Sequence, residues 1–271
     1  MALLANLVLV FLAGLVTALA TGLGALPFFV IDDVSDRLQV GLWGLASGIM
    51  VSASLFGLVL EGAAEADGRV DLALMGVGIL AGVLLVVVAD RVIADHEFDA
   101  RDYEQADYRK LVLILGILTV HSFPEGVAVG VSFAELGFQS ETAIAIGPFL
   151  VPVLAVFMTV AISIHNVPEG LAISIPLRAM DVSNWRMVWW AVFSSLPQPI
   201  GAVIAFAFVR VARDFLPAGF GFAAGAMVFL VLSEFIPEAL EMGAGLPGKG
   251  YRELVTGVAV GVAVMVPLAL V

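Results

Sequence analysis

The chain has 271 residues, of which 61% are hydrophobic, and its mean hydropathy is +1.09. Charged residues make up 13%, about half the share found in soluble globular proteins. Too few polar side chains remain to cover a soluble domain of this length, so the composition excludes an ordinary cytosolic enzyme and a disordered chain. The composition is typical of an integral membrane protein, whose solvent and partner is the lipid bilayer.

The charge balance narrows the function further. Twelve basic and 24 acidic residues give a net charge of −12, which repels phosphate backbones and argues against a nucleic-acid partner. The chain has no cysteine, so disulfides, thiolate zinc sites and cysteine nucleophiles are excluded.

Apolar runs predict the architecture. A helix that crosses the hydrocarbon core needs about 20 apolar residues. Eight such runs, bounded by charged or turn residues, predict an all-α fold: a polytopic membrane bundle of eight transmembrane helices forming one domain over residues 1–271. The runs cover residues 3–30, 39–60, 72–93, 111–134, 145–177, 186–210, 218–240 and 253–271. The first lacks a basic start and is too long for a signal peptide, so we expect it to be retained.

The distribution of basic residues predicts the orientation. Loops that follow odd-numbered runs carry nine Lys and Arg residues, whereas the others carry three. Because basic loops stay on the cytoplasmic side, we expect both termini outside the cell, with the protein in the plasma membrane. Glycines four residues apart predict close helix packing: Gly78 and Gly82, Gly221 and Gly225, and Gly257 and Gly261.

Two copies of one motif lie deep in the fourth and fifth runs. Residues 121–126 read HSFPEG and residues 165–170 read HNVPEG. His and Glu four positions apart share one helix face, and ionisable groups at that depth need partners. If the two faces meet, they offer two imidazoles and two carboxylates, which suit Zn²⁺ and also Fe²⁺ or Mn²⁺. In the alternative interpretation the pairs only tie two helices together, but the duplication favours a metal site.

Other residues of the motif support this interpretation. Pro124 and Pro168 each remove a backbone hydrogen bond, which predicts a kink and a free carbonyl beside each His. Ser122 and Asn166 follow the two His residues and offer oxygen ligands or supporting hydrogen bonds.

The eight runs, the outward termini and the paired motifs resemble the ZIP (ZRT/IRT-like) family of divalent metal transporters. The resemblance implies import of Zn²⁺ or a related ion into the cytosol, a homodimer, and inverted repeats of three runs around the central two. Ligation by His and carboxylate also suits Cd²⁺, and no prosthetic group is implied. Carried over by position, the family's ligands fall on His121, Ser122, Glu125, His165, Asn166 and Glu169.

This chain departs from the family's motif at two positions of the same site, and a third position also concerns the site. Many bacterial relatives carry Asn where this chain has Ser122, and Glu in the sixth run where it has Gln198. The missing carboxylate predicts a weak or absent second metal position. Met50 resembles in context a family methionine near the first metal, although packing is the ordinary role of a methionine in an apolar span.

Acidic residues near the predicted cytoplasmic ends suggest an exit route. Glu234 and Glu238 lie on one helix face of the seventh run, where Glu234 is the deeper, and Asp90 is a weaker exit candidate in the third. A solvated helix end is the alternative. His96 lies in an acidic loop that we interpret as a solvated charge run.

Two rival functions use the same residues. A proton-linked transporter of an organic solute could use His–Glu pairs as relays. An intramembrane metal-dependent hydrolase would also fit the ligands, but the chain has no HExxH motif and no Ser–His pair with a third orienting group. We therefore expect a metal transporter and not an enzyme.

Overall fold

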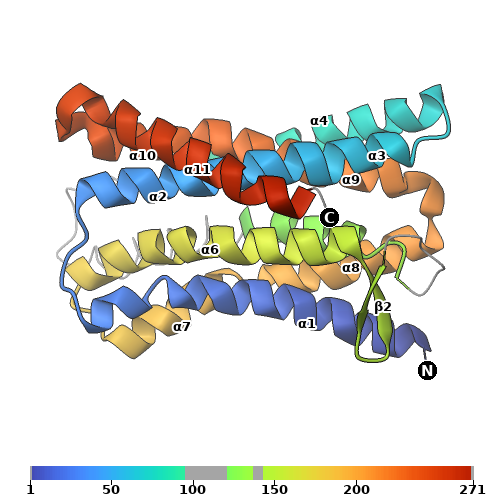
Figure 1. The fold of residues 1–271 in the computed structure, drawn as a ribbon, viewed down its shortest axis with the longest axis horizontal. Helices are drawn as coiled ribbons and strands as arrows, with labels where there is room; N and C mark the ends of the chain where they lie inside the picture. The colour runs from blue at the N-terminus through green and yellow to red at the C-terminus, as the bar shows by residue number, and fades with distance from the viewer. Residues whose placement is uncertain (1, 95–120, 137–142, 270–271) are drawn as a thin grey trace.

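A computed structural model describes residues 2–94, 121–136 and 143–269, and helices account for almost all of it (Figure 1). Within this part, seven helical stretches are long and apolar enough to cross a membrane. The prediction of an all-α, polytopic membrane protein is thus confirmed at that level. The fourth predicted run, 111–134, lies outside the described residues up to residue 120, and its residues 121–132 are helical. His96 and the last two residues of the eighth run also lie outside the described residues.

The described helices follow the order of the predicted runs. The first half contains α1 (Ala2–Leu23), α2 (Asp36–Ser52), α3 (Leu60–Ala64) and α4 (Arg69–Ala94). The second half contains α6 (Val153–Ala179), α7 (Asn184–Ser194), α8 (Pro197–Val211), α9 (Leu216–Leu230), α10 (Ile236–Met242) and α11 (Tyr251–Ala269). Short 3₁₀ turns are Leu26–Phe29, Arg213–Phe215, Gly243–Gly245 and Pro247–Gly250. Two π-helical segments, Ala53–Val59 and Val231–Phe235, join α2 to α3 and α9 to α10.

The fifth predicted run begins too early. Residues that were expected to be helical from 145 onward form an antiparallel hairpin of β1 (Ala143–Ile146) and β2 (Phe149–Pro152), and α6 begins only at Val153. Gly147 adopts a positive φ of 58° in the two-residue turn. Hydropathy alone does not separate a short apolar strand from a helix, whereas the Gly-Pro pair within the run was a turn signal.

The sixth run is two helices. α7 ends at Ser194 and α8 begins at Pro197, because a proline is favoured in the first helical turn and cannot continue the preceding helix. The break places Gln198 in the first turn of α8. By contrast, α6 continues through Pro168, so this proline does not end its helix.

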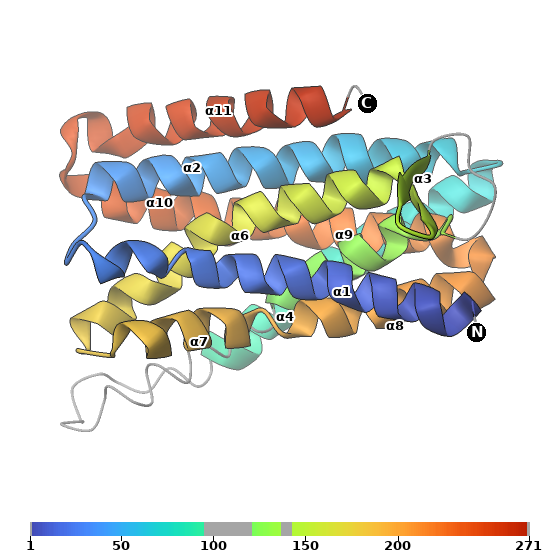
Figure 2. The same ribbon diagram turned by 60° about the horizontal axis from the view of Figure 1, so that its bottom comes forward.

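Glycines bring two pairs of helices into backbone contact. A Cβ on Gly44 would lie 2.3 Å from the carbonyl oxygen of Leu254, so α2 and α11 touch along this seam. The seam between α4 and α9 is equally close, since a Cβ on Gly78 would lie 2.1 Å from the carbonyl oxygen of Ala218. The predicted small-residue packing is therefore confirmed. Figures 1 and 2 show α11 lying along α2 at the edge of the bundle.

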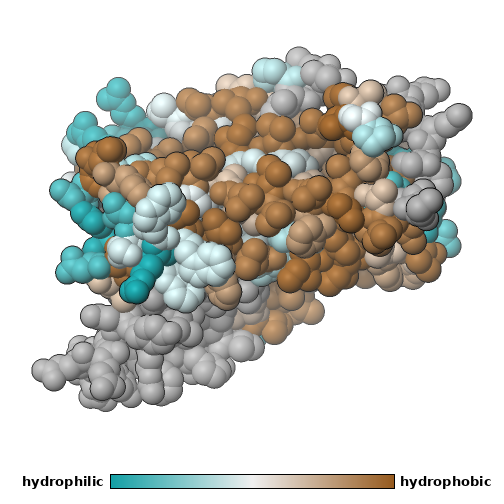
Figure 3. Space-filling view, turned by 90° about the horizontal axis from the view of Figure 1, so that it is seen from below, coloured by the Kyte–Doolittle hydropathy of each residue, from teal (hydrophilic) through white to brown (hydrophobic). Residues whose placement is uncertain are grey.

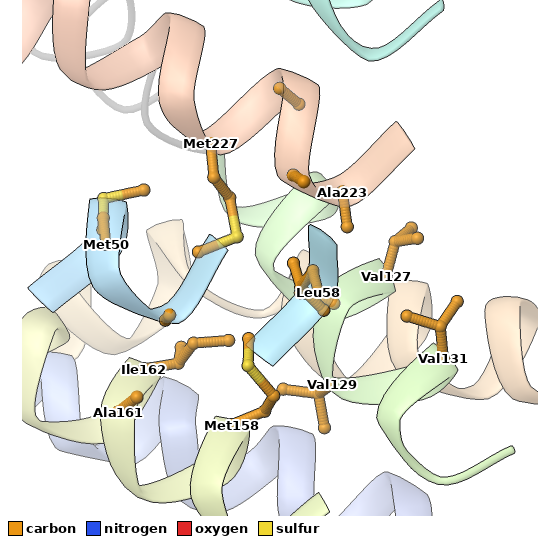
Figure 4. Close-up of a cluster of buried hydrophobic side chains, with 14 of the residues drawn as sticks. Met50, Leu58, Val127, Val129, Val131, Met158, Ala161, Ile162, Ala223 and Met227 are labelled. Atoms are coloured by element: carbon orange, nitrogen blue, oxygen red, sulfur yellow. The ribbon is translucent and has the colours of Figure 1, made fainter. Parts of the chain in front are cut away.

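The outer surface and the core are both apolar. Figure 3 shows hydrophobic residues over the middle of one face and hydrophilic residues gathered at one end, as a bilayer requires. The main core cluster includes Met50, Leu58, Met158 and Met227 (Figure 4). α6 lies between α1 and α2 and contacts both, which places its motif inside the bundle (Figure 2).

Candidate metal centre

The motif glycines let neighbouring helices approach the two HxxPEG segments. A Cβ on Gly126 would lie 2.2 Å from the carbonyl oxygen of Gln198 in α8. A Cβ on Gly170 would lie 1.7 Å from the carbonyl oxygen of Thr21 in α1. Any side chain at these positions would force the helices apart. The last residue of each motif therefore brings α8 and α1 close to the ionisable side chains.

Three ionisable residues of the motifs form one cluster, here called the buried cluster: Glu125, His165 and Glu169. All three are buried, and each offers a ligand atom within 4.8 Å of the others. His165 Nε2 lies 3.1 Å from Glu125 Oε1 and 3.8 Å from Glu169 Oε2. Two carboxylates and an imidazole at these distances match the donor set of a divalent transition-metal site.

Among the described residues, several buried polar atoms of the two motifs have no hydrogen-bond partner. They include Glu169 Oε2, His165 Nδ1, Asn166 Oδ1 and Ser122 Oγ. A buried polar atom without a partner costs free energy, so native proteins rarely keep one without a reason. Glu169 Oε2 is such an acceptor inside the buried cluster, and a bound cation would satisfy it.

Gln198 also lies at the buried cluster, where its amide makes hydrogen bonds. Its Nε2 donates to Glu125 Oε2 over 2.5 Å, and its Oε1 accepts from Asn166 Nδ2 over 3.0 Å. Asn166 Nδ2 also donates to the carbonyl oxygen of Thr17 over 2.7 Å. Gln198 thus supplies a neutral amide that holds Glu125.

His121 lies in a second group with Asp90 and Glu234, here called the half-buried cluster. His121 Nε2 is 2.8 Å from Glu234 Oε1 and 3.8 Å from Asp90 Oδ1. The imidazole is buried, whereas the side chains of Asp90 and Glu234 are 35% and 29% exposed. This cluster therefore connects the interior with the surface.

The structure divides the four residues that were expected to form one site. Glu125 meets His165 from the other motif helix, whereas His121 meets Glu234 from a third helix. Glu234 lies in the π-helical segment Val231–Phe235, and π-helical turns inside α-helices are frequent at functional sites.

Phe235 was not among the residues predicted for the site. Its ring stacks on the His165 imidazole with centroids 5.4 Å apart and planes 22° apart, and it also packs against Trp43 at 4.6 Å. Phe235 fixes one face of the imidazole and follows Glu234 directly, so one segment serves both clusters. No sequence signal separated it from the other 17 phenylalanines.

Met50 is fully buried in the main hydrophobic cluster, where Figure 4 shows it among apolar side chains. This agrees with its packing interpretation. A ligand role for its sulfur stays a prediction.

A polytopic helical bundle with imidazole–carboxylate clusters in its interior is the architecture of a membrane cation transporter. The family model described as "ZIP Zinc transporter" matches residues 90–269 of the chain. The chain therefore belongs to the ZIP zinc transporter family.

Curated relatives agree with this assignment. The zinc transporter GufA of Myxococcus xanthus is 31% identical over 84% of this chain and 88% of its own length. The zinc transporter ZupT of Corynebacterium aurimucosum is 30% identical, with 89% and 90% covered. A putative zinc transporter of Arabidopsis thaliana is 40% identical over 84% of this chain, which spans only 34% of that longer protein. Each of these relatives is named as a transporter and not as an enzyme.

Proposed function

We propose that this chain carries a divalent metal cation, zinc foremost, across the plasma membrane into the cytosol. The observation that carries the proposal is the buried cluster of Glu125, His165 and Glu169, with unpartnered acceptor atoms inside an apolar bundle. Membership of the ZIP zinc transporter family supports the choice of zinc. Fe²⁺, Mn²⁺ and Cd²⁺ are secondary substrates that suit the same ligands.

Electrostatics explains why this cluster would select a divalent cation. Two ionised carboxylates balance the charge of the ion, and the neutral imidazole of His165 adds a nitrogen ligand that zinc favours. Burial strengthens the attraction because little water screens it. Ser122 Oγ and Asn166 Oδ1 are buried, have no hydrogen-bond partner within the described part of the chain, and could complete the ligand shell.

Two clusters of different exposure suggest a route. The ion would lose its water against Glu125 and Glu169, bind His165, and then pass to His121, Asp90 and Glu234. The second cluster includes Asp90, which precedes Arg91 near the end of α4. The acidic loop that follows α4 also carries three of the basic residues that set the predicted orientation. By the distribution of basic residues that end faces the cytosol, with both termini outside, so the ion would move inward.

We also propose eight transmembrane helices, in which the first three and the last three are inverted repeats of one another. Three features support a repeat. The second and seventh spans each contain a π-helical segment, Ala53–Val59 and Val231–Phe235. The glycine seams pair the second span with the eighth and the third with the seventh. The fourth and fifth spans carry the two HxxPEG motifs. The family resemblance also favours a homodimer.

The test is metal uptake by the purified full chain in liposomes, with a panel of Zn²⁺, Fe²⁺, Mn²⁺ and Cd²⁺. The double variant Glu125→Gln/Glu169→Gln should lose uptake and still elute and melt as a folded protein. The variant Asp214→Asn, which changes an exposed carboxylate outside both clusters, should transport normally. Normal metal uptake by the folded double variant would refute the proposal. Uptake of an organic solute driven by a proton gradient, without any metal flux, would favour the proton-linked alternative.

A further inference from the structure

A groove of about 520 Å³ lies between α2 and α11. This volume falls in the range of small-molecule sites in proteins. No residue of the two metal clusters lines it. The helices touch along their glycine seam, where a Cβ on Gly257 would lie 2.2 Å from the carbonyl oxygen of Gly41, and these two glycines line the groove.

One end of the groove is basic. Arg37 and Arg252 both line it, and each is the second residue of its helix. Glu253 is the only acidic residue of the lining, with its Oε1 3.8 Å from Arg37 Nε. In the part of the chain that the structure describes, Arg252 has no ion-pair partner. The lining thus has a net positive charge, in a protein whose net charge is −12.

Apart from Thr256, the rest of the groove is apolar. Leu38, Leu42 and Leu45 line it from α2, and Val260 lines it from α11. Leu45 lies eight residues after Arg37, and Val260 lies eight residues after Arg252, which corresponds to about 12 Å along each helix. Both helices run in the same direction, since Gly44 meets Leu254 and Gly48 meets Val258. A basic end therefore leads into an apolar stretch on both walls.

We propose that this groove binds one anionic glycerophospholipid, with its phosphate at Arg37 and Arg252 and an acyl chain along Leu42, Leu45 and Val260. Guanidinium groups bind phosphate oxygens in pairs, and basic pockets between transmembrane helices favour anionic headgroups. The protein as a whole repels anions, so attraction must come from these two residues. A net positive lining matches a lipid with one negative charge better than a zwitterionic lipid.

The test is native mass spectrometry of the full chain in detergent, titrated with phosphatidylglycerol or with phosphatidylcholine of the same acyl chains. We expect one phosphatidylglycerol per chain. The variant Arg37→Gln/Arg252→Gln should bind it about 30-fold more weakly, from the contribution of two basic residues near a membrane surface. The matched control Arg91→Gln/Arg186→Gln removes two exposed arginines that do not line the groove and should bind normally.

A second variant separates shape from charge. Thr256 lines the groove and is exposed, so Thr256→Trp should fill the space, keep all charges and leave the protein folded. We expect it to lose the bound phosphatidylglycerol. The proposal is overturned if Thr256→Trp and Arg37→Gln/Arg252→Gln both bind as the original chain does. It is also overturned if phosphatidylcholine binds equally well, or if the control double variant loses binding to the same extent.

Discussion

Gln198 donates a hydrogen bond from Nε2 to Oε2 of Glu125 over 2.5 Å, and both side chains are buried. The other oxygen of the same carboxylate, Oε1, lies 3.1 Å from His165 Nε2. Asn166 fixes the orientation of the Gln198 amide through a second hydrogen bond. One oxygen of Glu125 is therefore held by an amide that carries no charge, and we propose that this arrangement favours one bound ion over two.

The first prediction changes this amide into a carboxylate. In metal-free protein, Gln198→Glu removes the donor and places a like charge beside Glu125, so we expect a loss of about 1–3 kcal/mol in unfolding free energy. With zinc present, the extra carboxylate should strengthen binding of a second ion. Titration calorimetry and melting with and without a chelator measure both effects. Gln39→Glu adds the same charge outside both clusters and should leave the zinc stoichiometry unchanged, although it removes the hydrogen bond from Gln39 Nε2 to the carbonyl oxygen of Val34. Unchanged stoichiometry in Gln198→Glu would count against this interpretation.

The second prediction separates binding from release. Glu234→Gln removes a carboxylate 2.8 Å from His121 and leaves the buried cluster intact. Hydrogen bonds and contacts of charged groups contribute about 1.5–3 kcal/mol, so we expect uptake to fall about tenfold or more. Zinc binding to the buried cluster should persist in calorimetry. Glu241→Gln, at an exposed position on α10, is the control and should transport normally. Loss of all zinc binding in Glu234→Gln would contradict the separate roles of the two clusters.

The third prediction concerns the contact between α6 and α1. Gly170→Ala would place a Cβ 1.7 Å from the carbonyl oxygen of Thr21, so the two helices must separate. Overpacking of this kind costs about 1–3 kcal/mol, and it should also displace Glu169 and reduce uptake. Gly76→Ala is the matched control because a Cβ there meets no atom within 4 Å. Alanine in a helix interior should stabilise that variant by roughly 0.5–1 kcal/mol. Equal melting temperatures for both variants would show that the close approach carries no cost.

The fourth prediction is the pH dependence of uptake. A metal ion binds His165 only as neutral imidazole, and Glu125 and Glu169 only as carboxylates, so protons compete with the ion. Lowering the pH on both sides of the liposome from about 7.5 to about 5.5 should reduce zinc uptake, since more protons then compete with the ion for the same ligand atoms. Melting curves across the same range check that the protein stays folded. A rise in zinc uptake with acidity would contradict simple competition and would favour coupling to protons.

Much of the candidate site was readable from the chain alone. Ionisable side chains are so costly in lipid that the two HxxPEG segments stood out against the apolar runs, and the same reasoning marked Glu234 and Asp90. The resemblance of these motifs identified the family, which the match over residues 90–269 confirms. Helix spacing also predicted that glycines would lie where helices touch.

Only the tertiary structure decided how these residues are grouped. His121 contacts Glu234, whereas Glu125 contacts His165. The spacing of residues along one helix does not predict these pairs, because the two partners in each pair come from separate helices. Nor could it find Phe235 on the imidazole of His165, since any aromatic residue in an apolar span looks like packing. Hydropathy likewise predicted a helix over residues 145–152, because an apolar strand and an apolar helix have the same hydropathy. The structure has a hairpin there, with Gly147 in its turn. The sequence thus determined the chemistry of the site, and packing between distant segments determined which atoms share it.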